Sequence, residues 1–190
     1  MAIDLQAKLQ AAANVIDGRV VDDSERVGIC IKGIVMGFPA TIEAIGEGWP
    51  WPTTYTLETN PVVDPNAREE TYGAKISICP RVGRGFFRFF SNILLFESRG
   101  QPIGDKKLES KLIFSYDDRE LAERFVRYPN VGDHLLALEH VSKFSEAIIK
   151  TDTGIYLSQP TPFKSVDLDV VRATFREMAE LGQVLFDAFS

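Results

Sequence analysis

The sequence has few of the residues that most often build metal centres and catalytic sites. It contains only two cysteines, Cys30 and Cys79, and two histidines, His134 and His140. The cysteines lack the paired spacing of structural zinc sites, and two histidines six residues apart would point in different directions from a helix. Nothing local pairs a nucleophile with a base. The sequence therefore predicts no metal site, no cofactor and no assignable catalytic residue.

Disulfide frameworks, secretory signals and membrane spans are also missing from the pattern. Two cysteines cannot form a framework, and the amino terminus does not combine a basic region with an apolar one. The most apolar window, residues 86–96, is about half of the ~20 residues that a transmembrane helix needs. We expect a soluble protein without a transmembrane segment in the reducing cytoplasm.

Neither sign of charge is in large excess, but one stretch lacks acids altogether. The formal net charge of the 190 residues is −6, which disfavours nucleic acid as a partner. Residues 71–96 contain no aspartate or glutamate, whereas Lys75, Arg81, Arg84 and Arg88 are present. Four phenylalanines, at positions 86, 87, 89 and 90, are interleaved with these basic residues. In this basic and aromatic segment, basic residues are not matched by any acidic ones, which makes it the most unusual part of the chain in its charge.

Two interpretations of that segment stay open. Basic groups among aromatic ones can contact an anionic small molecule, a lipid surface or a protein, and single-stranded nucleic acid is bound by the same combination. Alternatively, the phenylalanines pack in the core and the arginines are solvated. Two tryptophans, each followed by proline, form a second candidate surface that can also fold back over the sheet. The candidate contact residues are Arg81, Arg84, Arg88, Trp49 and Trp51.

Hydrophobic periodicity predicts the secondary structure. Alternation with a period of two predicts strands over residues 27–35, 41–45, 53–59, 74–79, 108–116, 144–150 and 155–159. Spacings of three and four predict helices over residues 3–16, 117–128, 130–138 and 166–189. We expect Asp117 and Ser165 to cap the second and the last of these helices, and Tyr128, which precedes a proline, to end the second. A helix is favoured over a strand in residues 81–96, and residues 60–72 are expected to form an exposed loop.

This order of elements predicts the fold class. Hairpins come first, a strand and helices follow, and another hairpin precedes a long carboxy-terminal helix. The order is typical of an α+β fold with a largely antiparallel sheet covered by helices on one face. A dinucleotide-binding fold would need repeated strand–helix–strand units with a glycine-rich first turn, which are absent. We expect residues 1–190 to form a single domain, with residues 1–18 as a loosely attached helix.

One segment resembles a known family. A Gly104-Asp105 pair precedes a predicted strand that contains Glu109 and Phe114, and an acidic helix start follows at Asp117. This arrangement resembles a family of uncharacterised bacterial proteins, a domain of unknown function, over residues 27–186. The chain departs from the family pattern where Glu109 replaces an aspartate and Leu112 replaces a phenylalanine. The resemblance implies a bacterial protein of unknown function and brings no catalytic residue.

Three functional hypotheses follow from the sequence. The first is a non-enzymatic binding or protein-interaction domain whose contact surface includes the basic and aromatic segment. The second is a small enzyme that acts on an anionic small molecule, with the arginines holding the substrate and Asp105 or Asp133 as the base. The third is a homo-oligomer that associates through its long carboxy-terminal helix. The partner is thus an unidentified protein, a small anionic ligand or a second copy of the chain.

Overall fold

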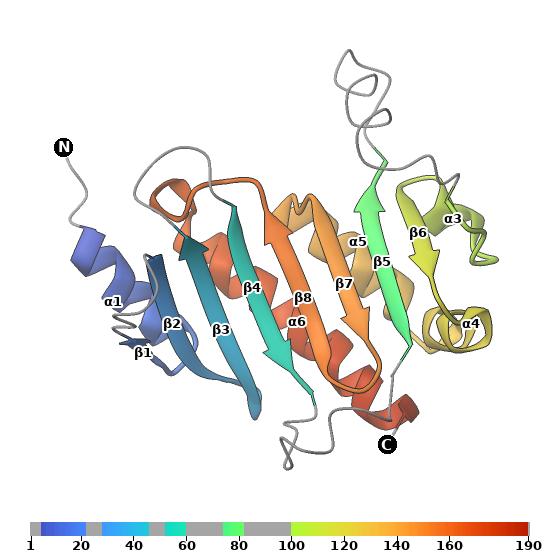
Figure 1. The fold of residues 1–190 in the computed structure, drawn as a ribbon, viewed down its shortest axis with the longest axis horizontal. Coiled ribbons are helices and arrows are strands. Elements are labelled where there is room, and N and C mark those ends of the chain that lie inside the picture. Colours follow the sequence, from blue (N-terminus) through green and yellow to red (C-terminus); the bar gives the residue numbers. More distant parts are fainter. Residues whose placement is uncertain (1–4, 22–27, 46–51, 60–73, 82–99, 190) are drawn as a thin grey trace.

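A computed structural model describes residues 5–21, 28–45, 52–59, 74–81 and 100–189 of the chain. Within them, one antiparallel sheet has the strand order β1-β2-β3-β4-β8-β7-β5-β6 (Figure 1). Its strands are β1 (Arg19–Val21), β2 (Gly28–Val35), β3 (Phe38–Ile45), β4 (Thr53–Glu58), β5 (Lys75–Pro80), β6 (Leu112–Tyr116), β7 (Glu146–Lys150) and β8 (Gly154–Gln159).

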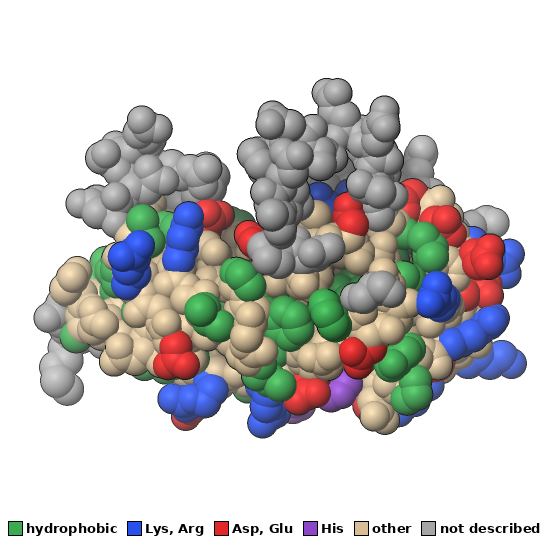
Figure 2. Space-filling model, turned by 90° about the horizontal axis from the view of Figure 1, so that it is seen from below, with side chains coloured by type: hydrophobic (Ala, Val, Ile, Leu, Met, Phe, Trp, Pro, Cys, Tyr) green, Lys and Arg blue, Asp and Glu red, His purple; other side chains and the backbone are tan. Residues whose placement is uncertain are grey.

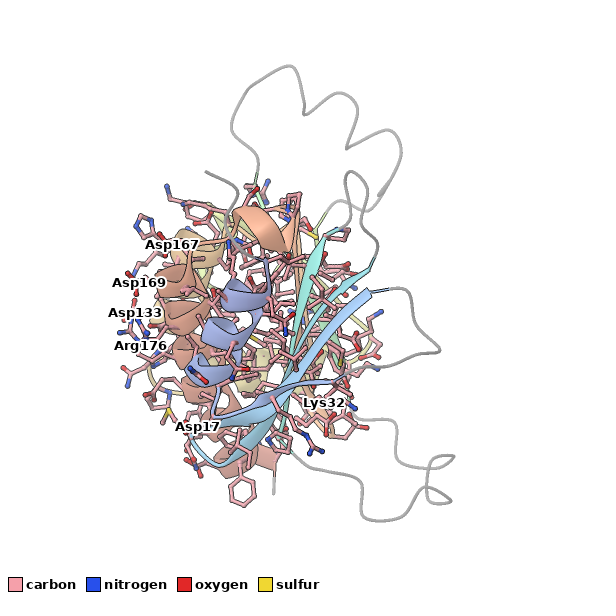
Figure 3. The ribbon with its side chains drawn as sticks, turned by 90° about the vertical axis from the view of Figure 1, so that its left-hand side faces the viewer. Asp17, Lys32, Asp133, Asp167, Asp169 and Arg176 are labelled. Atoms are coloured by element: carbon pink, nitrogen blue, oxygen red, sulfur yellow. The ribbon has the colours of Figure 1, made fainter. Side chains whose placement is uncertain are left out.

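The helices cover one face of this sheet, as Figure 3 shows in side view. They are α1 (Leu5–Val15), α3 (Lys106–Glu109), α4 (Arg119–Arg127), α5 (Val131–Ser142) and α6 (Leu168–Phe189). Helix α6 packs against β2, β4 and β8, and it also contacts α1, α4 and α5. The predicted α+β class, with an antiparallel sheet and a long carboxy-terminal helix, is confirmed. No helix in the described residues is long and apolar enough to cross a bilayer.

The core lies between the sheet and the helices. One row of side chains crosses seven strands in register and is at most 2% exposed; it consists of Ile31, Ile42, Tyr55, Leu157, Ala147, Ile78 and Phe114. Helix α6 packs its buried face onto this row, and the ring of Phe175 meets that of Tyr55 edge-on at 5.6 Å between centroids. Because neighbouring side chains of a strand alternate in direction, a period of two in the sequence was sufficient to predict this face.

The strand predicted over residues 108–116 is wrong in its first half. Asp105 Oδ1 accepts hydrogen bonds from the backbone N–H groups of Lys107 and Leu108, at 2.8 and 3.0 Å. This cap begins the one-turn helix α3, and β6 starts only at Leu112. Leu108 and Leu112 both reach the core, Leu108 from α3 and Leu112 from β6.

Two predicted helix caps are also wrong. Asp118 caps α4 by accepting a hydrogen bond from Leu121 N–H at 3.0 Å. The neighbouring Asp117 instead accepts one from Lys75 N–H at 2.8 Å, where β5 begins. Ser165 lies in the short 3₁₀ helix Phe163–Ser165, and Asp167 accepts the hydrogen bond from Asp169 N–H that opens α6. The predicted end of α4 at Tyr128 is confirmed.

The first hairpin is tighter than predicted. Strand β3 begins at Phe38 rather than at residue 41, so only Met36 and Gly37 connect it to β2. Both residues have positive φ, at 50° and 87°. Pro39 pairs with Ile34 inside the ladder. The predicted strands at 53–59, 144–150 and 155–159 are confirmed by β4, β7 and β8, whereas the predictions for residues 60–72 and 82–96 lie outside the described residues.

Candidate functional site

Arg81 is held in place by main-chain carbonyl groups. It directly follows β5, and its backbone N–H donates to the carbonyl oxygen of Lys111 at 2.6 Å. Its side-chain Nε donates to the carbonyl oxygen of Glu109 at 2.7 Å. Among the described residues, no carboxylate pairs with this guanidinium. Within this part of the chain, the side chain is therefore oriented by a neutral acceptor and not by an ion pair.

Three lysines lie in the same part of the structure, and with Arg81 they form what we call the basic corner: Arg81, Lys106, Lys107 and Lys111. All four residues are exposed. Lys106 and Lys107 belong to α3, and Lys111 lies between α3 and β6. The basic corner therefore stands at the end of the sheet where β5 ends and β6 begins.

The acidic groups of this region are directed at backbone amides. Glu109 Oε1 accepts hydrogen bonds from the N–H groups of Ile103 and Gly104, at 2.8 and 2.9 Å. Asp105 caps α3, as described above. These carboxylates stabilise the chain segment that carries the lysines. Neither of them neutralises the guanidinium of Arg81 through an ion pair.

Asp133 forms an exposed ion pair with Lys107. Asp133 Oδ1 and Lys107 Nζ are 2.9 Å apart, and the two side chains are 74% and 69% exposed. The hydrogen bond from Lys107 lowers the pKa of Asp133 and raises the pKa of the lysine. A carboxylate with a lowered pKa is a weaker base. The roles that an enzyme would give to Asp105 and Asp133 therefore gain no support from their surroundings.

Arg81 is the one predicted contact residue that the structure describes. Arg84, Arg88, Trp49 and Trp51 lie outside the described residues. The sequence could single out Arg81 from the absence of acids around it. It could not show that the carbonyl oxygen of Glu109 accepts a hydrogen bond from the guanidinium. Every residue has a backbone carbonyl group, so the residue type does not reveal which one is the acceptor.

No family model, no curated protein and no solved structure matches this chain. The geometry of the described residues is therefore the basis on which function is argued below.

A second polar cluster joins α5 to α6. The Glu177 side chain is only 8% exposed, and its Oε2 lies 3.0 Å from His134 Nδ1. Its Oε1 accepts hydrogen bonds from Nε and Nη2 of Arg176, at 3.0 and 2.8 Å. Figure 3 shows Arg176 on the outer side of the helical layer. A buried carboxylate shared by two basic groups fixes how these helices pack.

The remaining histidine and the cysteines are not assembled into a site. His140 lies on α5 and is exposed. Cys30 on β2 and Cys79 on β5 are not joined by a disulfide. Burial together with the nearby Glu146 raises the pKa of Cys79, which lowers its thiolate fraction. Within the described residues, no group of three or more potential ligands could hold a metal ion.

The Glu177 cluster predicts a specific dependence of stability on pH. Burial alone would raise the pKa of Glu177, but the hydrogen bonds from His134 and Arg176 outweigh it and the pKa is lowered from 4.5. The contribution of a carboxylate with a lowered folded-state pKa is complete above its unfolded pKa and is lost as pH falls through the folded value. We expect the stability difference between the wild type and Glu177→Gln to shrink steadily below about pH 4.5 in denaturant titrations.

Glu180→Gln is the matched control for that experiment, because Glu180 lies on the same helix one turn further along. Its effect on the free energy of unfolding should be small. A Glu177→Gln difference that stays constant from neutral to acidic pH would contradict the interpretation.

Proposed function

We propose that this protein is a non-enzymatic binding domain that contacts an acidic protein partner through the basic corner. The observation that carries the proposal is the guanidinium of Arg81, which is oriented by the Glu109 carbonyl oxygen and pairs with no carboxylate of the described residues. An arginine that already forms an ion pair within its own chain attracts an acidic partner only weakly. None of the described residues neutralises Arg81 in this way.

The geometry of Arg81 suits recognition of a carboxylate. Its one side-chain hydrogen bond to a described residue uses Nε, so no described residue occupies the N–H groups of the two terminal nitrogens. These groups form a planar fork that matches the two oxygens of a carboxylate. Lys106 and Lys111 add positive charge nearby, which speeds the association of an acidic partner with a chain whose overall charge is −6.

A protein partner fits the corner better than a small anionic molecule does. Small ligands are usually bound in concave sites that bury most of their surface. Arg81, Lys106 and Lys111 are all exposed. Exposed, separated charges are typical of the rim of a protein–protein interface.

We place this binding activity in the cytoplasm. Cys30 and Cys79 form no disulfide with each other, because β3, β4, β8 and β7 separate their strands in the sheet. Two cysteines that are not joined by a disulfide suit a reducing compartment.

Replacing Arg81 with glutamine tests the proposal. The probe is a fluorescein-labelled peptide of alternating glutamate and glycine residues, and its binding is followed by fluorescence anisotropy at low salt. We expect Arg81→Gln to weaken binding about fivefold, the loss of one surface ion pair worth roughly 1 kcal/mol. The wild-type affinity should also fall as salt is added.

The matched control is Arg172→Gln. Arg172 is 64% exposed and already pairs with Asp169, at 2.6 Å on the surface of α6. Its replacement should change the peptide affinity less than twofold. Equal losses in the two variants would show that the peptide responds only to net charge, and would refute the basic corner as a docking surface.

A further inference from the structure

The carboxylates around the basic corner differ in what they contact. Asp105 caps α3, and Glu109 accepts hydrogen bonds from two backbone N–H groups. Asp133 is instead directed at a cation, and its Oδ1 lies 2.9 Å from Nζ of Lys107. The other three basic side chains of the corner pair with no carboxylate of the described residues. Lys107 is therefore the cation of the basic corner that already has an acidic partner within the described chain.

The ion pairs on α4 show what helix geometry alone produces. Glu123 pairs with Arg119 and with Arg127, each four residues away, at 2.7 and 2.6 Å. Figure 2 views the molecule from the side on which α4 lies and shows basic and acidic side chains beside each other there. Residues four apart are neighbours on any helix, so such pairs need no tertiary contact. Lys107 and Asp133 are 26 residues apart on two different helices, so the packing of α3 against α5 brings them together.

The packing of α3 against α5 does not depend on this ion pair. Leu108 of α3 is fully buried, and a Cβ placed on Gly132 of α5 would lie 3.5 Å from its Cδ1 atom. Val131 and Leu135, on either side of Asp133, are also fully buried. These contacts fix the backbone at Asp133. An ion pair between exposed side chains adds little to such packing, so the pair is not explained as a structural contact.

The pair can open without any change in the fold. The side chains of Lys107 and Asp133 are 69% and 74% exposed, and Figure 3 shows Asp133 on the outer side of the helical layer. The long, flexible side chain of the lysine can turn away while its backbone N–H stays bonded to Oδ1 of Asp105. A carboxylate on an acidic partner offers Lys107 the same kind of acceptor as Asp133 does. The two carboxylates therefore compete for one ammonium group.

We propose that Asp133 is an internal competitor of the acidic partner, which occupies Lys107 in the free protein and weakens binding at the basic corner. This inference rests on the proposed function and adds its regulation. A partner meets no competing carboxylate of the described residues at Arg81. To engage Lys107 as well, it must displace Asp133 and approach a negative charge that stays on α5, which is unfavourable for an acidic molecule.

Replacing Asp133 with asparagine tests the competition. Asp133→Asn should bind the labelled glutamate and glycine peptide about threefold more tightly than the wild type at low salt, the effect of releasing one surface ion pair. A merely structural role predicts no such gain. Asp133 lies in the first turn of α5, where a negative charge is favourable, so the variant should be slightly less stable. Tighter binding by a less stable variant cannot come from better folding.

Asp169→Asn is the matched control. Asp169 also lies in the first turn of a helix, is 84% exposed, and pairs with Arg172 at 2.6 Å on α6. Its replacement removes the same charge and releases a cation outside the basic corner. The peptide affinity should change by less than about 1.5-fold, because exposed charges that are far apart are screened by salt. An equal gain in the two variants would show an effect of net charge alone and would overturn the proposal.

Lys107→Gln shows whether Asp133 acts through Lys107. The loss of affinity that it causes should be about threefold in the Asp133→Asn background and clearly smaller in the wild type, where Asp133 already occupies the lysine. Equal losses in the two backgrounds would mean that Asp133 does not compete for Lys107.

The ion pair itself can be measured without a partner. Hydrogen exchange of the Lys107 ammonium group, followed by ¹⁵N NMR, should be slower in the wild type than in Asp133→Asn. If the exchange rates differ as expected and the wild type binds the peptide, but Asp133→Asn binds no more tightly, the competition is refuted and the binding function stands. If neither protein binds the peptide, the binding function is refuted and the competition with it.

Discussion

A Gly154→Ala variant should lose about 3 kcal/mol or more of unfolding free energy, measured by chemical denaturation. Gly154 begins β8 and has a φ of 141°, which side-chain-bearing residues rarely adopt. A Cβ at this position would lie 2.0 Å from the carbonyl oxygen of Leu57 and 3.0 Å from Cα of Glu58. Both atoms belong to the backbone of the neighbouring strand β4, which is paired on both sides and cannot move aside.

Gly37→Ala provides the control for backbone strain alone. Gly37 also has a positive φ, at 87°, but a Cβ there would meet no atom within 4 Å. Its replacement should cost only about 1–2 kcal/mol, the penalty for an L-residue with positive φ. The excess loss in Gly154→Ala then measures the close approach of β8 to β4. Similar losses in the two variants would show that this approach is not tight in solution.

The periodicity of the sequence predicted which residues face the helices, but not which strands are neighbours. Alternation around Tyr55 and Leu57 placed both side chains in the core, and the structure buries both. Strand β8 lies between β4 and β7, so the last hairpin is inserted into the centre of the sheet. A period of two describes a strand and one of its faces. It contains no information about which strand lies beside it in the sheet, because packing between distant parts of the chain determines the strand order.

Local errors arose where two signals used the same residues. Leu108 and Leu112 fit an alternating strand and a helical turn equally well, and the Asp105 cap decided for the turn. Asp117 and Asp118 are both acceptable caps for α4. The hydrogen bond between Asp117 and the start of β5 leaves the cap to Asp118. In the second case, the cap was determined by a tertiary contact between residues far apart in the sequence. Local sequence rules contain no information about such a contact.

The basic corner and the tight first hairpin differ in how visible they were in the sequence. The acid-free segment identified Arg81 directly. The two-residue turn was missed, because Phe38 and Pro39 were assigned with Met36 and Gly37 to a longer connection. A methionine where a two-residue turn prefers asparagine was the available signal, and it required the correct hairpin length to be recognised.

A buried polar network connects the sheet to α5. The Tyr55 hydroxyl donates to Oε1 of Gln159 at 2.8 Å, and Nε2 of Gln159 donates to the carbonyl oxygen of Ser142 at 2.7 Å. Tyr55 is fully buried and Gln159 is 5% exposed. Burial raises the pKa of Tyr55, so the phenol stays protonated and remains a donor. Each member of the network therefore depends on the next one for its hydrogen bond.

Tyr55→Phe should lower the free energy of unfolding by about 1–3 kcal/mol, because it leaves the buried amide oxygen of Gln159 without a donor. Gln159→Leu should cost a similar amount, since Tyr55 and the Ser142 carbonyl then lose their partner. The double variant should lose clearly less than the sum, because removing both members leaves fewer unpaired groups than the single changes do. Tyr156→Phe, at a half-buried position on β8, is the control and should stay within about 0.5 kcal/mol of the wild type. Strictly additive losses in denaturant titrations would mean that the hydroxyl and the amide contribute independently, and that the network does not couple β4 to α5.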